Sequence, residues 1–442
     1  MPKKLFFDTW NTQDGEYALI QGKDFQLLVP KKDKKLVSNL KDYTSIDALI
    51  EHYEDLFSIF NQIAGFDGSS KTNQNGENRY FLKADKNGAG GAYYNDRWTA
   101  NSYESIDMWV TKLGWGTLHE IAHGYQTGFD GQGMYTGEVS NNLFAVQYQY
   151  EKYGKDADKL GWLFNFGKKV AVEKNLYTKM IEENGSYSTL DLRSQLIILT
   201  MLKQKAGNDG FSKMYQGYRK LASQPNFNKK DYQLPDLMNK YYSENSKQDF
   251  TPSLERLGLK LTGNQAEINR SKAYPAVASL VDVVPKSELE RARDLIDPTV
   301  LINSNFEMVT NSEIVELGLK GELSVSLKSG DIKELKGMTL QLKEGNKVVQ
   351  KQIIQRDSVT FEQVPNGVYT VMLTGEKSYQ FTQDKAYVYV KEAQNESTIT
   401  VQKINVSNLT NQKIQFVGLS YTFGMFSTNL NEKKRYFFFV IN

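Results

Sequence analysis

Residues 115–126 of this 442-residue chain read WGTLHEIAHGYQ, and this stretch decides what the surrounding fold has to support. It contains two of the three histidines in the sequence, His119 and His123. A helix brings residues i and i+4 onto one face, so both imidazoles could bind one metal ion. Glu120 is offset by one residue and could hold a metal-bound water without being a ligand itself. The alternative interpretation is a surface helix with two unpaired histidines.

A catalytic zinc site needs a third protein ligand and one position left open for water. Asp130 and Glu138 are the only acidic residues within 25 positions after His123, and the spare histidine, His52, lies far upstream. Asp130 falls in a glycine-rich turn, whereas Glu138 is expected to open a second helix, which positions a ligand more rigidly. We therefore expect Glu138 to complete the site; the alternative is an ordinary carboxylate in the first turn of a helix. Asn142, one turn further on, shares its face and could hydrogen-bond a metal ligand.

These segments resemble a known family. The stretch 115–126, followed by GEVSNNL at 137–143, is similar to the enhancin-type, mucin-degrading zinc metallopeptidases, in which HExxH precedes a glutamate after a variable gap. Two further pieces resemble the same family, GAGGAYY at 88–94 and FTPSLERLGL at 250–259. The resemblance covers about residues 10–300.

The resemblance implies a role for each matching residue. His119, His123 and Glu138 would be the ligands of one Zn²⁺ per chain, and Glu120 would be the catalytic base. Family members are mostly exported and act on heavily O-glycosylated proteins, often through appended carbohydrate-binding modules. The resemblance thus implies an extracellular enzyme with a protein or glycoprotein substrate such as mucin.

A glycine-rich strand upstream of the histidines is a weaker candidate for substrate binding. In zinc peptidases the substrate commonly pairs as an extra strand beside the metal. Gly90, Gly91, Ala92 and Tyr93 could provide that edge, because small residues let another backbone approach. The alternative is a hairpin turn without substrate contact. The 26 tyrosines do not single out a residue that stabilises the oxyanion.

Composition excludes several classes of protein. The 54 basic and 52 acidic residues are spread along the chain, which leaves no basic footprint for nucleic acid. Absence of cysteine excludes disulfides and thiolate metal sites. No apolar run reaches the roughly 18 residues of a membrane span. The first residues turn polar after Phe7, so no export signal is expected, and the chain either stays inside the cell or is a mature or trimmed form.

The predicted fold class is α+β, with a zincin-like catalytic region followed by a small β-sandwich. Residues 1–100 are expected to form a β-rich N-terminal part, and residues 101–300 a mainly helical zinc peptidase domain. Residues 318–404 alternate apolar and polar positions between turns, which predicts an immunoglobulin-like sandwich. Residues 405–442 resemble the incomplete start of a carbohydrate-binding module. We hypothesise that 318–442 targets the enzyme, so that a chain ending near residue 305 still cleaves short glycopeptides.

Periodicity predicts the individual elements. Short strands are expected throughout residues 1–35, for example at 17–20 and 25–29, and again at 79–83 and 91–94. Helices are expected at 46–60 (capped by Thr44 or Ser45), 190–205 (capped by Ser188 or Thr189 and stopped by Gly207), 209–222, 234–245, 252–258 and 264–272.

The favoured function is therefore a zinc-dependent endopeptidase acting on mucin-like O-glycosylated proteins. One alternative is a glycan-binding adhesion protein with a vestigial peptidase domain, which the intact Glu120 disfavours. A second alternative is a zinc peptidase toxin that acts on an intracellular protein, which the missing signal permits.

Overall fold

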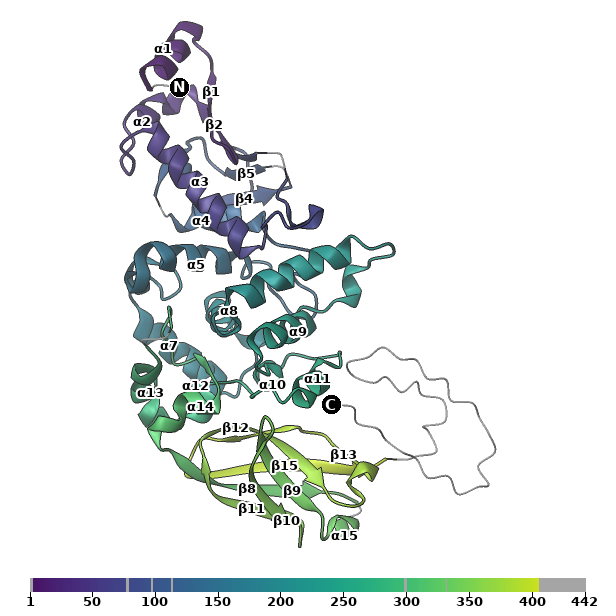
Figure 1. The fold of residues 1–442 in the computed structure, drawn as a ribbon. Coiled ribbons are helices and arrows are strands. Elements are labelled where there is room, and N and C mark those ends of the chain that lie inside the picture. Colours follow the sequence, from purple (N-terminus) through teal and green to yellow (C-terminus); the bar gives the residue numbers. More distant parts are fainter. Residues whose placement is uncertain are drawn as a thin grey trace.

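The computed structural model of this chain describes residues 3–76, 79–96, 98–112, 114–297, 300–330 and 332–404. Figure 1 shows three parts that follow one another along the chain: a small sheet with its helices, a helical region and a β-rich region. The β segment predicted at 405–442 lies outside the described residues. None of the described helices is both long and apolar enough to cross a membrane.

The first sheet has five strands in the order β1-β2-β3-β5-β4. Their bounds are β1 (Tyr17–Gln21), β2 (Phe25–Pro30), β3 (Tyr80–Ala84), β4 (Ala92–Asn95) and β5 (Trp98–Asn101). β2, β3 and β5 run parallel, whereas β1 and β4 pair antiparallel at the two edges. The predicted strands of this region are confirmed, and β4 is an edge strand.

The first residues differ from expectation, because α1 (Lys3–Gln13) is a helix and not a strand. Phe6, Phe7 and Trp10 explain this difference. Their rings lie 5.2–6.5 Å apart in one cluster, which the i and i+4 spacing of a helix allows. The Trp10 indole also donates a hydrogen bond to the Gly15 carbonyl, 2.8 Å away, and so fastens the helix end to the following turn.

The helix α3 (Ile46–Ile63) confirms the prediction for 46–60, with Ser45 as its cap. The Ser45 hydroxyl accepts from the Ala48 backbone N–H at 3.0 Å, which satisfies one of the free donors at the helix start. Its apolar face is buried in the main core, together with the inner positions of the first sheet. This core supports the helix that carries the histidines.

The helical region contains the predicted helices with shifted ends. Its longer helices are α4 (Trp115–His123), α5 (Asn141–Tyr153), α7 (Lys169–Tyr177), α8 (Leu192–Ala222), α9 (Leu234–Ser246), α10 (Thr251–Arg256), α11 (Gln265–Ser271) and α13 (Leu289–Ile296). Shorter helices of the chain are α2 (Lys34–Ser38), α6 (Ala157–Leu160), α12 (Leu280–Val283), α14 (Asn311–Ile314) and α15 (Ile332–Leu335). Two short strands, β6 (Ala278–Ser279) and β7 (Met308–Val309), pair antiparallel near the C-terminal end of this region.

α8 merges two helices that were predicted separately. Gly207 does not end the first of them but interrupts the run with φ 77° and ψ 162°, a conformation that a side chain would strain. The cap is Asp191, not Ser188 or Thr189, because its carboxylate accepts from the Ser194 N–H at 3.0 Å. A side chain added at Gly207 would meet no atom within 4 Å.

The β-rich region has two four-stranded sheets, β10-β9-β12-β14 and β11-β8-β15-β13, which bury one shared apolar core. The strands are β8 (Lys320–Lys328), β9 (Thr339–Glu344), β10 (Lys347–Ile353), β11 (Ser358–Pro365), β12 (Gly367–Thr374), β13 (Phe381–Gln383), β14 (Tyr387–Val390) and β15 (Gln394–Lys403). β8 and β15 pair in parallel, and the other pairs are antiparallel.

This region is fastened to the helical part by buried contacts. Tyr387 donates a hydrogen bond to the buried carboxylate of Asp249, and Asn366 donates to the Val283 carbonyl at 3.0 Å. Val368 of β12 and Tyr387 of β14 belong to the main core and not to the core between the two sheets. A cut near residue 305 would expose this apolar surface, and the expectation that such a chain still cleaves short glycopeptides stays a prediction.

Candidate metal centre

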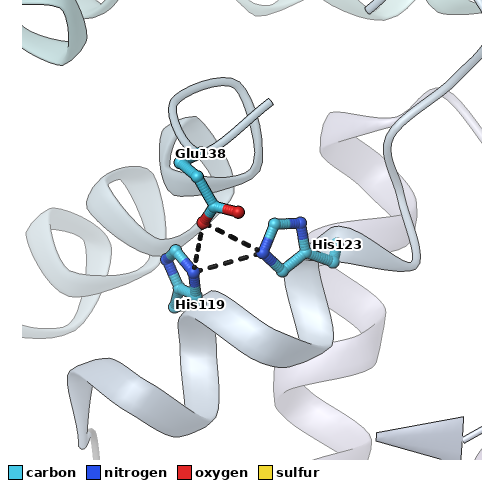
Figure 2. A group of neighbouring side chains, drawn as sticks. All are labelled: His119, His123 and Glu138. Atoms are coloured by element: carbon cyan, nitrogen blue, oxygen red, sulfur yellow. Dashed lines mark hydrogen bonds and ion pairs between the residues drawn. The ribbon is translucent and has the colours of Figure 1, made fainter. Parts of the chain in front are cut away.

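The two histidines of the motif face one another on α4. Their rings lie 4.7 Å apart between centroids, and their Nε2 atoms are separated by 3.1 Å (Figure 2). α4 holds this orientation because Leu118, Ile121 and Ala122 on its other side are buried in the main core. The helix ends at His123, with Gly124 as its C-terminal cap.

Glu138 reaches the same point from a different element (Figure 2). Its Oε2 lies 3.2 Å from Nε2 of His119 and 3.5 Å from Nε2 of His123. Glu138 lies in a turn and not in the predicted helix, since α5 begins only at Asn141. The Gln126 amide donates to the Gly137 carbonyl at 2.8 Å and so connects this turn to the residues that follow α4.

The three ligand atoms fit a zinc ion. Zinc binds imidazole nitrogen and carboxylate oxygen at about 2.0–2.1 Å in tetrahedral geometry, which puts ligand atoms about 3.3 Å apart. The observed separations of 3.1, 3.2 and 3.5 Å agree with this edge length. His119, His123 and Glu138 also form the one group of potential metal ligands found among the described residues. A His₂Glu set leaves a fourth position for water.

Amide side chains hold both imidazoles through their other nitrogen. Nδ1 of His119 lies 2.8 Å from Oδ1 of Asn142, and Nδ1 of His123 lies 2.7 Å from Oε1 of Gln126. Both Nδ1 atoms therefore donate, so both Nε2 atoms direct a lone pair toward Glu138. Asn142 also donates to the Glu138 backbone carbonyl at 2.9 Å and so joins two of the candidate ligands.

Sequence reasoning anticipated the position of Asn142 but missed Gln126. Gln126 lies three residues after His123, a spacing that places both on one side of a helical turn. The same carboxamide donates to Ser140 at 2.8 Å, so it also ties the loop before α5 to the end of α4. The sequence signal that could have identified Gln126 is its side-chain amide, three residues after the second histidine of the motif.

Glu120 lies next to the centre and is 8 % exposed. Burial, and then the charge of Glu138, raise the pKa of Glu120 to about 7. None of the described residues hydrogen-bonds its carboxylate, so its oxygens are available to a water or a substrate. Burial also lowers the pKa of His119, which favours the neutral imidazole that binds metal.

The two candidates set aside in the sequence have other roles. His52 is buried among Tyr43, Tyr53 and Tyr148, and burial lowers its pKa to about 4. Asp130 accepts from the Thr127 N–H at 2.8 Å and from Thr136 at 3.1 Å. Both therefore serve the packing of the core and the loop.

Comparison of the sequence with known proteins identifies a family for this chain. Residues 6–255 match the sequence profile described as Peptidase M60, enhancin and enhancin-like. The chain belongs to this family. The viral-enhancing factor of Heliothis armigera granulosis virus is 23% identical over an alignment of 373 residues that covers 78% of this chain and 39% of that protein. This M60 chain thus spans well under half of that relative's length.

One solved structure shares the fold at low sequence identity. A conserved Bacillus anthracis protein of unknown function superposes with a TM-score of 0.50 at 14% identity, over 92% of this chain and 76% of the other. The M60 catalytic domain of Clostridium perfringens ZmpC, solved with the sialyl T antigen, gives 0.49 at 16% identity, over 84% and 70%. The first comparison supports the mixed α/β architecture of this M60 chain.

The edge strand β4 lies beside the centre of this M60 chain. The Tyr94 ring stacks near His123, with centroids 6.4 Å apart and planes 24° from parallel. Strand alternation places Tyr93 on the opposite face, where its hydroxyl donates to Asp85 at 2.5 Å. A side chain added at Gly91 would meet no atom within 4 Å, so the backbone there can be approached. Tyr94, one residue beyond the predicted segment, is thus the tyrosine of β4 that stacks near His123.

Proposed function

We propose that this M60 chain is a zinc-dependent endopeptidase that cleaves peptide bonds in mucin-like, O-glycosylated proteins. The observation that carries the proposal is the convergence of His119 Nε2, His123 Nε2 and Glu138 Oε2 at 3.1–3.5 Å. Family membership supports peptidase chemistry at this centre. The proposed substrate class follows from the family and not from the geometry.

The proposed roles follow from the position of each side chain. His119, His123 and Glu138 would hold the ion, which when bound acidifies a water and polarises the scissile carbonyl. Glu120 accepts the proton of the attacking water and delivers it to the leaving amine nitrogen. Asn142 keeps the His119 ring oriented, since its Oδ1 lies 2.8 Å from Nδ1 of that histidine.

On the substrate side, we assign β4 as the edge against which the peptide backbone lies. Gly90, Gly91 and Ala92 leave that backbone open, and β4 is paired only with β5 among the described strands. Tyr94 would contact the peptide where it passes His123. Because the family resemblance implies exported enzymes, we also propose an extracellular site of action.

The test is a digest of one mucin-type substrate before and after enzymatic removal of its O-glycans, with the product ends mapped by mass spectrometry. We expect new N-termini next to glycosylated residues in the first sample and none in the second. Glu120→Gln serves as the control that keeps the glycan contacts but lacks the base. Binding without cleavage by the native chain would support an adhesion protein, and equal cleavage of the bare peptide would remove the glycan requirement.

A further inference from the structure

A cavity of about 440 Å³ lies at the boundary between the helical part and the β-rich region. One wall is the end of α11 with the residues that follow it, Arg270 to Tyr274, and the other is the sheet β10-β9-β12-β14. In Figure 1, α11 lies next to this sheet, whereas α4 lies beside the first sheet at the other end of the helical region. Small-molecule sites in proteins typically have volumes of about 300–1,000 Å³. The cavity is therefore large enough for a ligand and is separate from the metal centre.

Strand alternation and register determine which side chains the sheet presents to the cavity. Leu342 is buried in the core between the two sheets, so the next residue of β9, Lys343, points to the outer face. Thr370 of β12 lies opposite Lys343, and Tyr387 of β14 lies opposite Thr370. These three residues form one row across the outer face. α11 meets this row at Tyr387, whose hydroxyl accepts a hydrogen bond from Arg270 at 3.1 Å.

Two lysines of this cavity have no partner of opposite charge. Lys343 is partly exposed and Lys385 is exposed, and neither ammonium group makes an ion pair or a hydrogen bond with a described residue. No Asp or Glu is among the described residues that line the cavity. Because both side chains reach solvent and each ammonium carries three donors, both can donate hydrogen bonds to a bound anion.

The acidic residues of the segments around the cavity do not balance these two lysines. Glu267 pairs with Arg270 at 3.2 Å, and Asp384 accepts from the Thr400 N–H at 2.7 Å. Glu344 points to the opposite face of β9, because successive side chains of a strand alternate. The charge of Arg270 is thus paired, whereas the charges of the two lysines are not.

Two further lysines lie beside Tyr274 on the other wall. The ammonium groups of Lys247 and Lys272 lie 5.9 and 6.0 Å from the centre of the Tyr274 ring, and both side chains are exposed. Positive charge therefore surrounds the cavity on both walls. Such an arrangement attracts anions, most strongly at low ionic strength.

The uncharged groups of the lining match a polar ligand with a hydroxyl-rich body. The Thr370 hydroxyl makes no hydrogen bond with any described residue, and the exposed Ser271 adds a second hydroxyl. Met372 is exposed on the same face of β12 and offers an apolar contact. A bare sulfate or carboxylate ion is much smaller than this cavity. A sugar ring, which combines hydroxyls with apolar C–H faces, matches these groups.

We propose that this cavity binds a saccharide that carries a negatively charged group, a sulfate or a carboxylate. The charged group accepts hydrogen bonds from the ammonium groups of Lys343 and Lys385, and the sugar hydroxyls contact Thr370 and Ser271. The assignment of this saccharide to the substrate rests on the proposed function, in which the substrate is an O-glycosylated protein. A long substrate held at this cavity meets the metal centre at a raised effective concentration.

The test measures binding of galactose, galacturonic acid and galactose 6-sulfate to the zinc-loaded full chain by calorimetry. The three sugars share one ring and differ in the group at a single carbon. We expect saturable binding of one or both charged sugars and none of galactose, with an affinity that falls as the salt concentration rises. The two charged sugars show whether sulfate or carboxylate is preferred. No peptide is cleaved in this assay, so its result does not depend on the proposed peptidase activity.

Variants of the two lysines locate the binding site. Lys343→Gln and Lys385→Gln should each weaken binding about three- to tenfold, because each removes one hydrogen bond to a partly exposed anion. Lys328→Gln is the matched control, since Lys328 is an exposed lysine of β8 in the other sheet, and it should bind as the native chain does. Both cavity variants should keep the native melting temperature, because neither ammonium group has a partner to lose.

Four results would overturn the proposal. The first is equal affinity for galactose and the charged sugars, and the second is the absence of saturable binding by either charged sugar. The third is native affinity in both cavity variants, which would place the anion at the zinc ion instead. The fourth is binding of inorganic sulfate as tight as that of galactose 6-sulfate, which would show that the sugar ring contributes nothing. A failure of the peptidase proposal would appear in the digest and not in these measurements.

Discussion

Replacement of Asn142 by alanine tests whether the side-chain amide that hydrogen-bonds Nδ1 of His119 increases the affinity of the centre for zinc. The change removes the acceptor 2.8 Å from Nδ1 of His119 and the donor 2.9 Å from the Glu138 carbonyl. Loss of such an outer partner typically weakens metal binding about 10–100-fold, or about 1.4–2.7 kcal/mol. Asn142 is 2 % exposed, so bulk water does not replace it, and we expect the upper half of that range.

The assay is a zinc titration of the chelator-stripped protein against a competing chelator. Gln149→Ala is the matched control, because Gln149 is also 2 % exposed on α5 but its side chain accepts from Trp162, away from the histidines. We expect Gln149→Ala to lower the melting temperature without a change in zinc affinity. Native zinc affinity in Asn142→Ala, with a folded protein, would refute the assignment of this amide as a positioning residue.

Further predictions concern the carboxylates and the attachment of the β-rich region. Glu120→Gln should retain zinc but lower kcat by a factor of about 10²–10⁴, whereas Glu138→Gln should weaken zinc retention; elemental analysis and peptide hydrolysis together check both, and the reverse pattern would exchange the two roles. Burial raises the pKa of Glu307 from 4.5 to about 8, so its stabilising contribution is fully present below pH 4.5 and is lost as the pH rises through 8. In urea unfolding at several pH values, the free energy of unfolding should fall less with rising pH in Glu307→Gln than in the native chain. An equal fall in both proteins would exclude Glu307 as the source of the pH dependence. Tyr387→Phe removes the donor to buried Asp249 and should lower the free energy of unfolding by about 1–3 kcal/mol, while an unchanged midpoint in urea would show that this contact contributes nothing.

The sequence alone predicted those helices and strands that depend on interactions between residues close together in the chain. The spacing of His119 and His123 predicted the helix and its shared face, because helical periodicity depends only on nearby residues. Alternation and turn residues located β1 to β4 for the same reason, and the hydrophobic period of α3 with its Ser45 cap was readable directly. The choice of Glu138 over Asp130 rested on an expected helix, and the structure has a turn at that residue instead.

Tertiary contacts decided what local patterns could not. Glu138 lies in a turn where the sequence predicted a helix, and the Gln126 amide, 2.8 Å from the Gly137 carbonyl, connects this turn to the residues that follow α4. The contacts between the β-rich region and the helical part join side chains far apart in the sequence, such as Asn366 and the Val283 carbonyl. Such contacts arise only after the chain has folded, because the partners of a buried polar group are chosen by packing and not by sequence distance.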